Sequence, residues 1–170
     1  MLTLEELQKA TINPEVAREA HTQVQKRLED ALATKASHEQ KAFALMAAYV
    51  TLALAAFTGF GVFAKDQPEF APALFWTGLL FTAGAGICWW ALLPGDYGTL
   101  GSDPSVWLRP GVIDGNAKAL PFTLAYEVYF HQQRINVSAE ANSAKALRVR
   151  CAVIAGLIAP LIPAFWLYWL

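Results

Sequence analysis

The sequence predicts an all-α integral membrane protein with three transmembrane helices and two long cytoplasmic helices that lead into spans one and three. The chain of 170 residues is 55% hydrophobic and only 16% charged, which is unusual for a soluble protein of this size. Three stretches of about 20 residues carry no charged side chain, and each is long enough to cross a hydrocarbon layer of about 30 Å. Glycine and proline are rare in the polar segments before the first and third stretches, which favours helices there.

The predicted spans cover residues 42–64, 72–93 and 151–170. A short outer loop at 65–71 joins the first two spans, and a glycine- and proline-rich loop at 94–121 follows the second. Cytoplasmic segments retain Lys and Arg, so the basic residues indicate the orientation. Six precede the first span, six lie between the second and third, and only Lys65 falls in the outer loop. We therefore expect the N-terminus and the 94–121 loop on the cytoplasmic side and the C-terminus on the outer side.

Aromatic residues fall where this topology places the two membrane interfaces. Trp89 and Trp90 lie at the cytoplasmic end of the second span. The outer ends of the spans carry Phe75, Trp76, Trp166, Tyr168 and Trp169. The aromatic belts therefore agree with the orientation that the basic residues indicate.

The polar segments at 1–41 and 122–150 are predicted to be cytoplasmic helices. Thr3 and Glu6 have capping-box spacing, and Asn13 followed by Pro14 is a second helix-start signal. No glycine or proline occurs between Glu15 and Thr58, so this helix is expected to continue into the first span. The predicted apolar stripes are Val16, Ala20, Val24, Leu28, Ala31 and Leu32 on the first helix and Leu124, Val128, Ile135, Ala139, Ala146 and Val149 on the second. We expect the two helices to form a parallel stalk beneath the bilayer.

Small residues recur every fourth position within two spans. The first span has Thr51, Ala55 and Gly59, and the second has Gly78, Thr82 and Gly86. Such residues let helix backbones approach closely in lipid, so these faces are predicted to be helix contacts. The contact can lie within one chain or between chains; the short outer loop favours at least one contact within the chain. We also expect a homo-oligomer.

Two prolines lie in the middle of the third span. Pro160 and Pro163 each remove a backbone donor and crowd the carbonyl four residues earlier, which predicts a kink. One interpretation is a hinge or gate. The other is a bend that neighbouring groups tolerate, with no role in function.

Several classes of function are disfavoured. Thirteen basic residues nearly balance 14 acidic ones, which leaves no basic surface for nucleic acid. The spans carry no charged side chain, which argues against active transport. His21, His38 and His131 are interpreted as solvated or packing residues, and no catalytic motif, metal site or cofactor site is recognised. The sequence therefore does not predict an enzyme.

The layout resembles the Pycsar transmembrane effector family and related small membrane effectors of bacterial antiphage defence. The matching segments are residues 30–36 (DALATKA), Leu93-Pro94, residues 101–104 (GSDP), and a long helix from Tyr126 through Asn142, Lys145 and Ala146 into the last span. Residues 37–41 (SHEQK) depart from the family pattern, because they add more than a turn of polar helix before the first span. The resemblance covers most of the chain by architecture, through short motifs.

The resemblance implies an effector that compromises the bacterial inner membrane to halt infection when a cytoplasmic signal arrives. In that membrane, the orientation that the basic residues indicate makes the C-terminus periplasmic. The trigger would be a cyclic nucleotide or a protein partner, and the available cations for that contact are Arg109, Lys118 and Arg134. The alternative is a membrane anchor or scaffold whose stalk recruits a cytoplasmic partner. In both interpretations the lipid bilayer is a partner.

Overall fold

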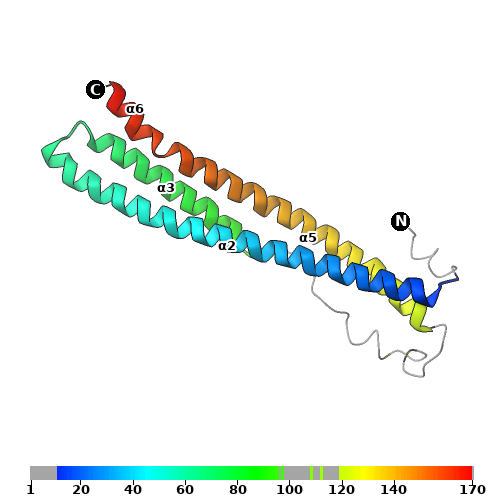
Figure 1. Cartoon of the computed structure of the whole chain (residues 1–170). Coiled ribbons are helices and arrows are strands. Elements are labelled where there is room, and N and C mark those ends of the chain that lie inside the picture. The colour runs from blue at the N-terminus through cyan, green and yellow to red at the C-terminus, as the bar shows by residue number, and fades with distance from the viewer. Residues whose placement is uncertain (1–10, 96, 98–107, 109–111, 113–118, 170) are drawn as a thin grey trace. The chain divides into compact units, whose positions relative to one another are not determined.

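The computed structural model describes residues 11–95, 97, 108, 112 and 119–169. Its helices are α2 (Pro14–Asp66), α3 (Ala71–Leu92), α5 (Ala119–Ile158) and α6 (Leu161–Trp169) (Figure 1). None of these described residues lies in a β-strand. Three stretches of helix, within Pro14–Asp66, Ala71–Leu92 and Ala119–Trp166, are long and apolar enough to cross a membrane. The all-helical class and the three candidate spans are thus confirmed.

Helix α2 begins where the sequence predicts. The Asn13 side-chain Oδ1 accepts hydrogen bonds from the backbone N–H groups of Glu15 at 2.9 Å and Val16 at 3.5 Å, which satisfies donors that a helix start leaves unpaired. Pro14 occupies the first helical position, where it needs no donor. The helix then continues for 53 residues to Asp66 without interruption. The start signal at Thr3 and Glu6 lies outside the described residues.

Helix α5 includes only the first part of the third predicted span, residues 151–158. It begins at Ala119, so Pro121 lies in its first turn, where proline is tolerated. It ends at Ile158, and α6 starts at Leu161 with Pro160 between them. The interruption predicted at Pro160 is therefore present, whereas Pro163 lies inside α6. A hinge function for these prolines stays a prediction.

The chain divides into two compact units. Unit 1 contains the described parts of residues 1–34 and 96–141, and unit 2 contains the described parts of residues 35–95 and 142–170. Helices α2 and α5 each contribute to both units, while α3 and α6 belong to unit 2.

The core of unit 2 is built by three helices. One cluster comprises Tyr49, Ala53, Phe81, Cys88, Ala152 and Ala159, and a second comprises Ala42, Ala91 and Val149. The unit 2 parts of α2 and α5 run parallel, because Glu39 contacts Lys145 and, further along both helices, Tyr49 contacts Ala152. At the other end, the Trp166 indole donates a hydrogen bond of 2.8 Å to the Glu69 carbonyl. The end of the chain thus meets the connection between α2 and α3.

The surface of unit 2 is apolar, as a membrane protein requires. Leu54, Leu157 and Phe165 are each more than 60% exposed. Aromatic residues predicted for the interfaces are also exposed, including Trp76 at 55%, Trp89 at 61% and Trp90 at 57%. Large exposed apolar surfaces of this kind are rare in soluble monomers.

The described part of unit 1 also contains buried apolar residues. Val24, Leu28 and Leu124 are buried in it, in agreement with the predicted stripes. Val16 was expected in the same stripe but is 64% exposed. That expectation is wrong, because Ala17 is the buried residue of the first turns.

Candidate functional site

One buried face of α5 is largely polar. Eight side chains follow this face at 8% exposure or less: Leu124, Glu127, His131, Ser138, Asn142, Lys145, Val149 and Ala152. They are spaced by three, four or seven residues, as in helices that pack along a continuous seam. The apolar stripe predicted for this helix is wrong in part, since Ala139 is exposed and Val128, Ile135 and Ala146 are only half-buried. Five of these eight buried positions carry polar groups instead.

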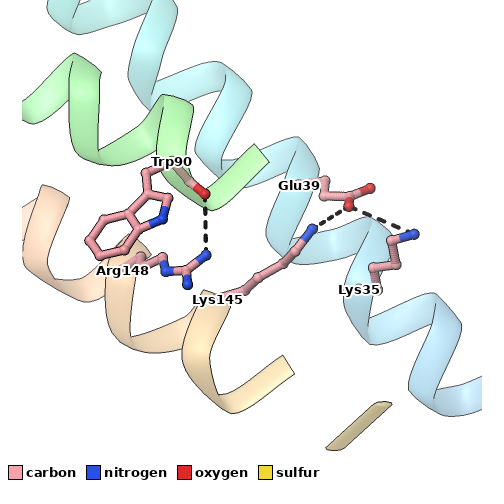
Figure 2. Close-up of polar contacts among 5 residues, drawn as sticks. All are labelled: Lys35, Glu39, Trp90, Lys145 and Arg148. Atoms are coloured by element: carbon pink, nitrogen blue, oxygen red, sulfur yellow. Dashed lines mark hydrogen bonds and ion pairs between the residues drawn. The ribbon is translucent and has the colours of Figure 1, made fainter. Parts of the chain in front are cut away.

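The closest polar contact joins α2 to α5 in unit 2. The Lys145 ammonium donates a hydrogen bond of 2.5 Å to Oε1 of Glu39 (Figure 2). The Lys145 side chain is 3% exposed, while that of Glu39 is 33% exposed. Lys35, one turn before Glu39, lies 3.9 Å from the same carboxylate oxygen. A buried charge of this kind needs a partner, so the pair fixes the position of one helix along the other.

A second contact joins α5 to α3, as Figure 2 also shows. The Arg148 guanidinium donates a hydrogen bond of 3.2 Å to the Trp90 carbonyl, and its Cζ lies 4.4 Å from the centre of the Trp90 ring. The Trp90 carbonyl is in the last turn of α3, where helix carbonyls lack a partner within the helix. A cation at this position is favourable both for the carbonyl and for the aromatic face.

Tyr49 connects all three helices of unit 2. Its hydroxyl donates a hydrogen bond of 2.7 Å to the Ala152 carbonyl of α5. Its ring lies against Gly84 of α3, where an added Cβ would come within 2.9 Å of the ring, and against Gly156 of α5. Glycine at both positions therefore makes room for one large side chain.

Unit 1 contains a histidine pair beside a carboxylate. The rings of His21 and His131 lie 5.8 Å apart, centre to centre. His131 Nδ1 lies 2.8 Å from the Glu127 carbonyl and 3.5 Å from Glu127 Oε2. Burial lowers the pKa of His21, nearby His131 lowers it further, and Glu127 opposes both effects in part. The interpretation of His131 as a packing residue fits its complete burial.

The predicted small-residue faces are only partly helix contacts within the chain. Gly78 is buried against the Phe57 ring, and Gly59 lies against Leu74. Thr51, Ala55, Thr82 and Gly86 are exposed, and their use between chains stays a prediction. A Cβ added at Gly86 would meet nothing within 4 Å.

The predicted ligand contacts are not brought together in the described part of the chain. Arg109 and Lys118 lie outside the described residues, and Arg134 is a half-buried residue of α5. In the described ranges, no group of three or more His, Cys, Asp or Glu residues is arranged to hold a metal ion.

An apolar cavity of about 300 Å³ lies in unit 2. It is lined by Phe63, Gln67, Phe70, Ala73, Leu74 and Pro163. Its walls offer almost no polar groups, so it fits a hydrocarbon chain better than a charged ligand.

Sequence reasoning missed the residues that make the closest contacts. No contact is predicted from the sequence for Glu39, Lys145 or Tyr49, because helix contacts are predicted there only from apolar stripes and from small residues at four-residue spacing. A signal was present: the polar residues at 127, 131, 138, 142 and 145 follow the three-and-four spacing of a helix seam.

Comparisons with known proteins give no relative. No protein-family model matches the chain, and neither does any curated protein or solved structure. The resemblance to Pycsar membrane effectors therefore stays a prediction from the sequence.

Proposed function

We propose that the protein is a non-enzymatic, oligomeric effector of the bacterial inner membrane that compromises the bilayer in response to a cytoplasmic signal. The observation that carries this proposal is the continuity of α2 and α5. Helix α2, over Pro14–Asp66, contains a polar segment and the whole first predicted span without a break. Helix α5, over Ala119–Ile158, joins a polar segment to the first part of the third predicted span (151–158), and α6 continues that apolar stretch. A shift or rotation of the polar segment would therefore move the span with it.

The polar contacts in unit 2 suit a switch. Glu39–Lys145 and Arg148–Trp90 lie next to the predicted spans, and their side chains are not members of the two apolar clusters of unit 2. A charged pair of this kind can make one arrangement of packed helices more stable than another by a few kcal/mol. We propose that the signal acts by breaking these contacts.

The proposal also includes the orientation in the membrane and a role in antiphage defence. The distribution of Lys and Arg supports a cytoplasmic N-terminus and a periplasmic C-terminus. The resemblance to Pycsar effectors supports a role in antiphage defence, with a cyclic nucleotide or a cytoplasmic protein as trigger. Arg109, Lys118 and Arg134 stay the candidate ligand contacts.

Dye leakage from liposomes that contain the purified protein tests the proposal. We expect leakage that depends on one member of a panel of cyclic mononucleotides and cyclic dinucleotides, or on a cytosolic fraction from infected cells. The Lys145→Met variant should leak at a lower dose of the trigger, because the resting contact is weakened, while Lys41→Met, at an exposed site of the same region, should not. Protein that is shown to be inserted and folded yet never causes leakage would contradict the proposal.

One observation favours the alternative of a membrane anchor that recruits a partner. Val16 is 64% exposed on α2, and it lies with Glu15, Glu19, Ala20 and Gln23 along a shallow surface depression. An exposed apolar residue between two carboxylates suits a protein segment with basic and apolar residues. Retention of a cytosolic protein by the wild type but not by Val16→Asp, with no leakage from either, would support the anchor.

A further inference from the structure

His131 is a buried histidine with one nitrogen satisfied and the other not. Its side chain is completely buried. A carbonyl oxygen can only accept, so the 2.8 Å contact with the Glu127 carbonyl places the ring proton on Nδ1. The neutral ring then carries a lone pair on Nε2, and none of the described residues donates to it. A buried acceptor without a donor is costly, and coordination of a metal ion would satisfy this lone pair.

His21 presents a second buried ring nitrogen. Its Nε2 is also buried, and it has no hydrogen-bond partner within the described ranges. Two imidazole rings from different helices therefore lie side by side in unit 1, with their centres 5.8 Å apart.

We propose that His21 of α2 and His131 of α5 bind one divalent transition-metal ion, such as Zn²⁺, through their Nε2 atoms. Neutral imidazole is a common ligand for these metals, and a metal-binding histidine usually donates its other N–H to a carbonyl or carboxylate. The Glu127 carbonyl and its carboxylate stand in that position behind His131.

The separation of the rings fits an ion between them. Zinc lies about 2.0–2.1 Å from a histidine nitrogen, so two rings bound to one ion have centres roughly 5–6 Å apart. The observed separation is 5.8 Å.

Two histidines make an open site. The described residues provide no third His, Cys, Asp or Glu around the same point, so water would complete the coordination. Binding should then be reversible and much weaker than at a closed structural zinc site of four protein ligands. The ion would join α2 to α5 within unit 1, so the metal would strengthen the pairing of these helices.

Titration of the full-length protein in detergent at pH 7.5 tests the proposal, with Zn²⁺ followed by calorimetry and Co²⁺ followed by visible absorption. We expect one ion per chain, and binding at least tenfold weaker in His21→Gln. His38→Gln is the matched control, because His38 is a half-buried histidine of the same helix, and it should bind like the wild type. Mg²⁺ in excess should not compete, since it prefers oxygen ligands.

His21→Gln is preferred to His131→Gln, because the completely buried His131 is more important for folding. Circular dichroism establishes that each variant keeps its helices. Thermal unfolding gives a second readout, in which Zn²⁺ should raise the Tm of the wild type and of His38→Gln but not that of His21→Gln. Absence of metal binding to the wild type would overturn the proposal, as would binding by His21→Gln that equals that of the wild type. An equal loss of metal affinity in His21→Gln and His38→Gln would also overturn it.

Discussion

Lys145 and Glu39 form an unequal ion pair. Their charged atoms lie 2.5 Å apart, yet the Lys145 side chain is 3% exposed and the Glu39 side chain is 33% exposed. Glu39 keeps contact with water and with Lys35, whereas Lys145 has lost almost all of its hydration. The cost of losing the partner therefore differs for the two residues.

We expect Glu39→Ala to destabilise the protein more than Lys145→Met. Glu39→Ala removes the carboxylate from a buried ammonium and should cost about 2–3 kcal/mol, whereas Lys145→Met leaves a partly hydrated carboxylate and should cost about 1 kcal/mol. Unfolding in mixed micelles with increasing SDS, followed by circular dichroism, measures both. Glu29→Ala and Lys41→Met, at exposed sites on α2, are the controls. Equal losses of stability in Glu39→Ala and Lys145→Met would show that the different exposures of the two side chains do not determine the cost of breaking the pair.

Gly156→Ala and Gly86→Ala should have opposite outcomes. A Cβ at position 156 would collide with the Tyr49 ring and hydroxyl, while a Cβ at position 86 would meet nothing within 4 Å. Overpacking at Gly156 should cost about 1–3 kcal/mol, and Gly86→Ala should be neutral within about 0.5 kcal/mol. The same SDS unfolding assay compares them, and a stable Gly156→Ala protein would contradict the position of Tyr49.

Gly86→Leu distinguishes a contact between chains from the fold of one chain. Open space at Gly86 lets a single chain accept the substitution. If the exposed face with Thr82 and Gly86 joins two chains, we expect a smaller oligomer with unchanged helix content. Size-exclusion chromatography with light scattering in detergent measures the oligomer. An oligomer of wild-type size would remove Gly86 from the predicted assembly face.

The sequence predicted what depends on length and local chemistry. Uncharged runs located the three candidate spans, Asn13 and Pro14 located the start of α2, and Pro160 located the break after α5. These features depend on residues close together in the chain. The contacts that unite the helices, such as Tyr49 with Gly84 and Gly156, depend on which faces meet. Spacing alone predicted a contact at Gly86 instead of Gly84, because the two glycines lie two residues apart in the same run of small residues.

Acid should weaken the pairing of α2 and α5 in unit 1. The pKa of His21 is lowered in the folded protein, by burial first and by His131 second, with partial opposition from Glu127. A histidine with a lowered pKa binds fewer protons when folded, so its contribution is complete above the unfolded value near 6.5 and is lost as the pH falls through the lower folded value. We expect the Tm to fall over this range, with a smaller fall in His21→Gln. An unchanged pH profile in that variant would assign the acid sensitivity to other groups.

Cysteines at positions 24 and 135 should form a crosslink. Val24 is buried three residues after His21, and Ile135 lies four residues after His131. Contact of the two histidine rings brings the next turns of two parallel helices together. The variant replaces Cys88 and Cys151 with alanine, and oxidation is followed by electrophoresis and peptide mass. Gln23→Cys with Ile135→Cys is the control, because Gln23 is exposed. A crosslink as efficient in the control would contradict the predicted pairing.

The position of Tyr49 bears on where a leak could open. One side chain of α2 fills the space between α3 and α5 and gives its only proton donor to the Ala152 carbonyl. Separating the three helices of a single chain would leave the Tyr49 hydroxyl without its acceptor, facing hydrocarbon or water, at a cost of about 1–3 kcal/mol. The Ala152 carbonyl lies inside α5, where the helix itself supplies a donor. Permeation along the boundary between neighbouring chains avoids this cost. Under the proposed function, ions and solutes would then cross between subunits, and the interior of each subunit would stay closed.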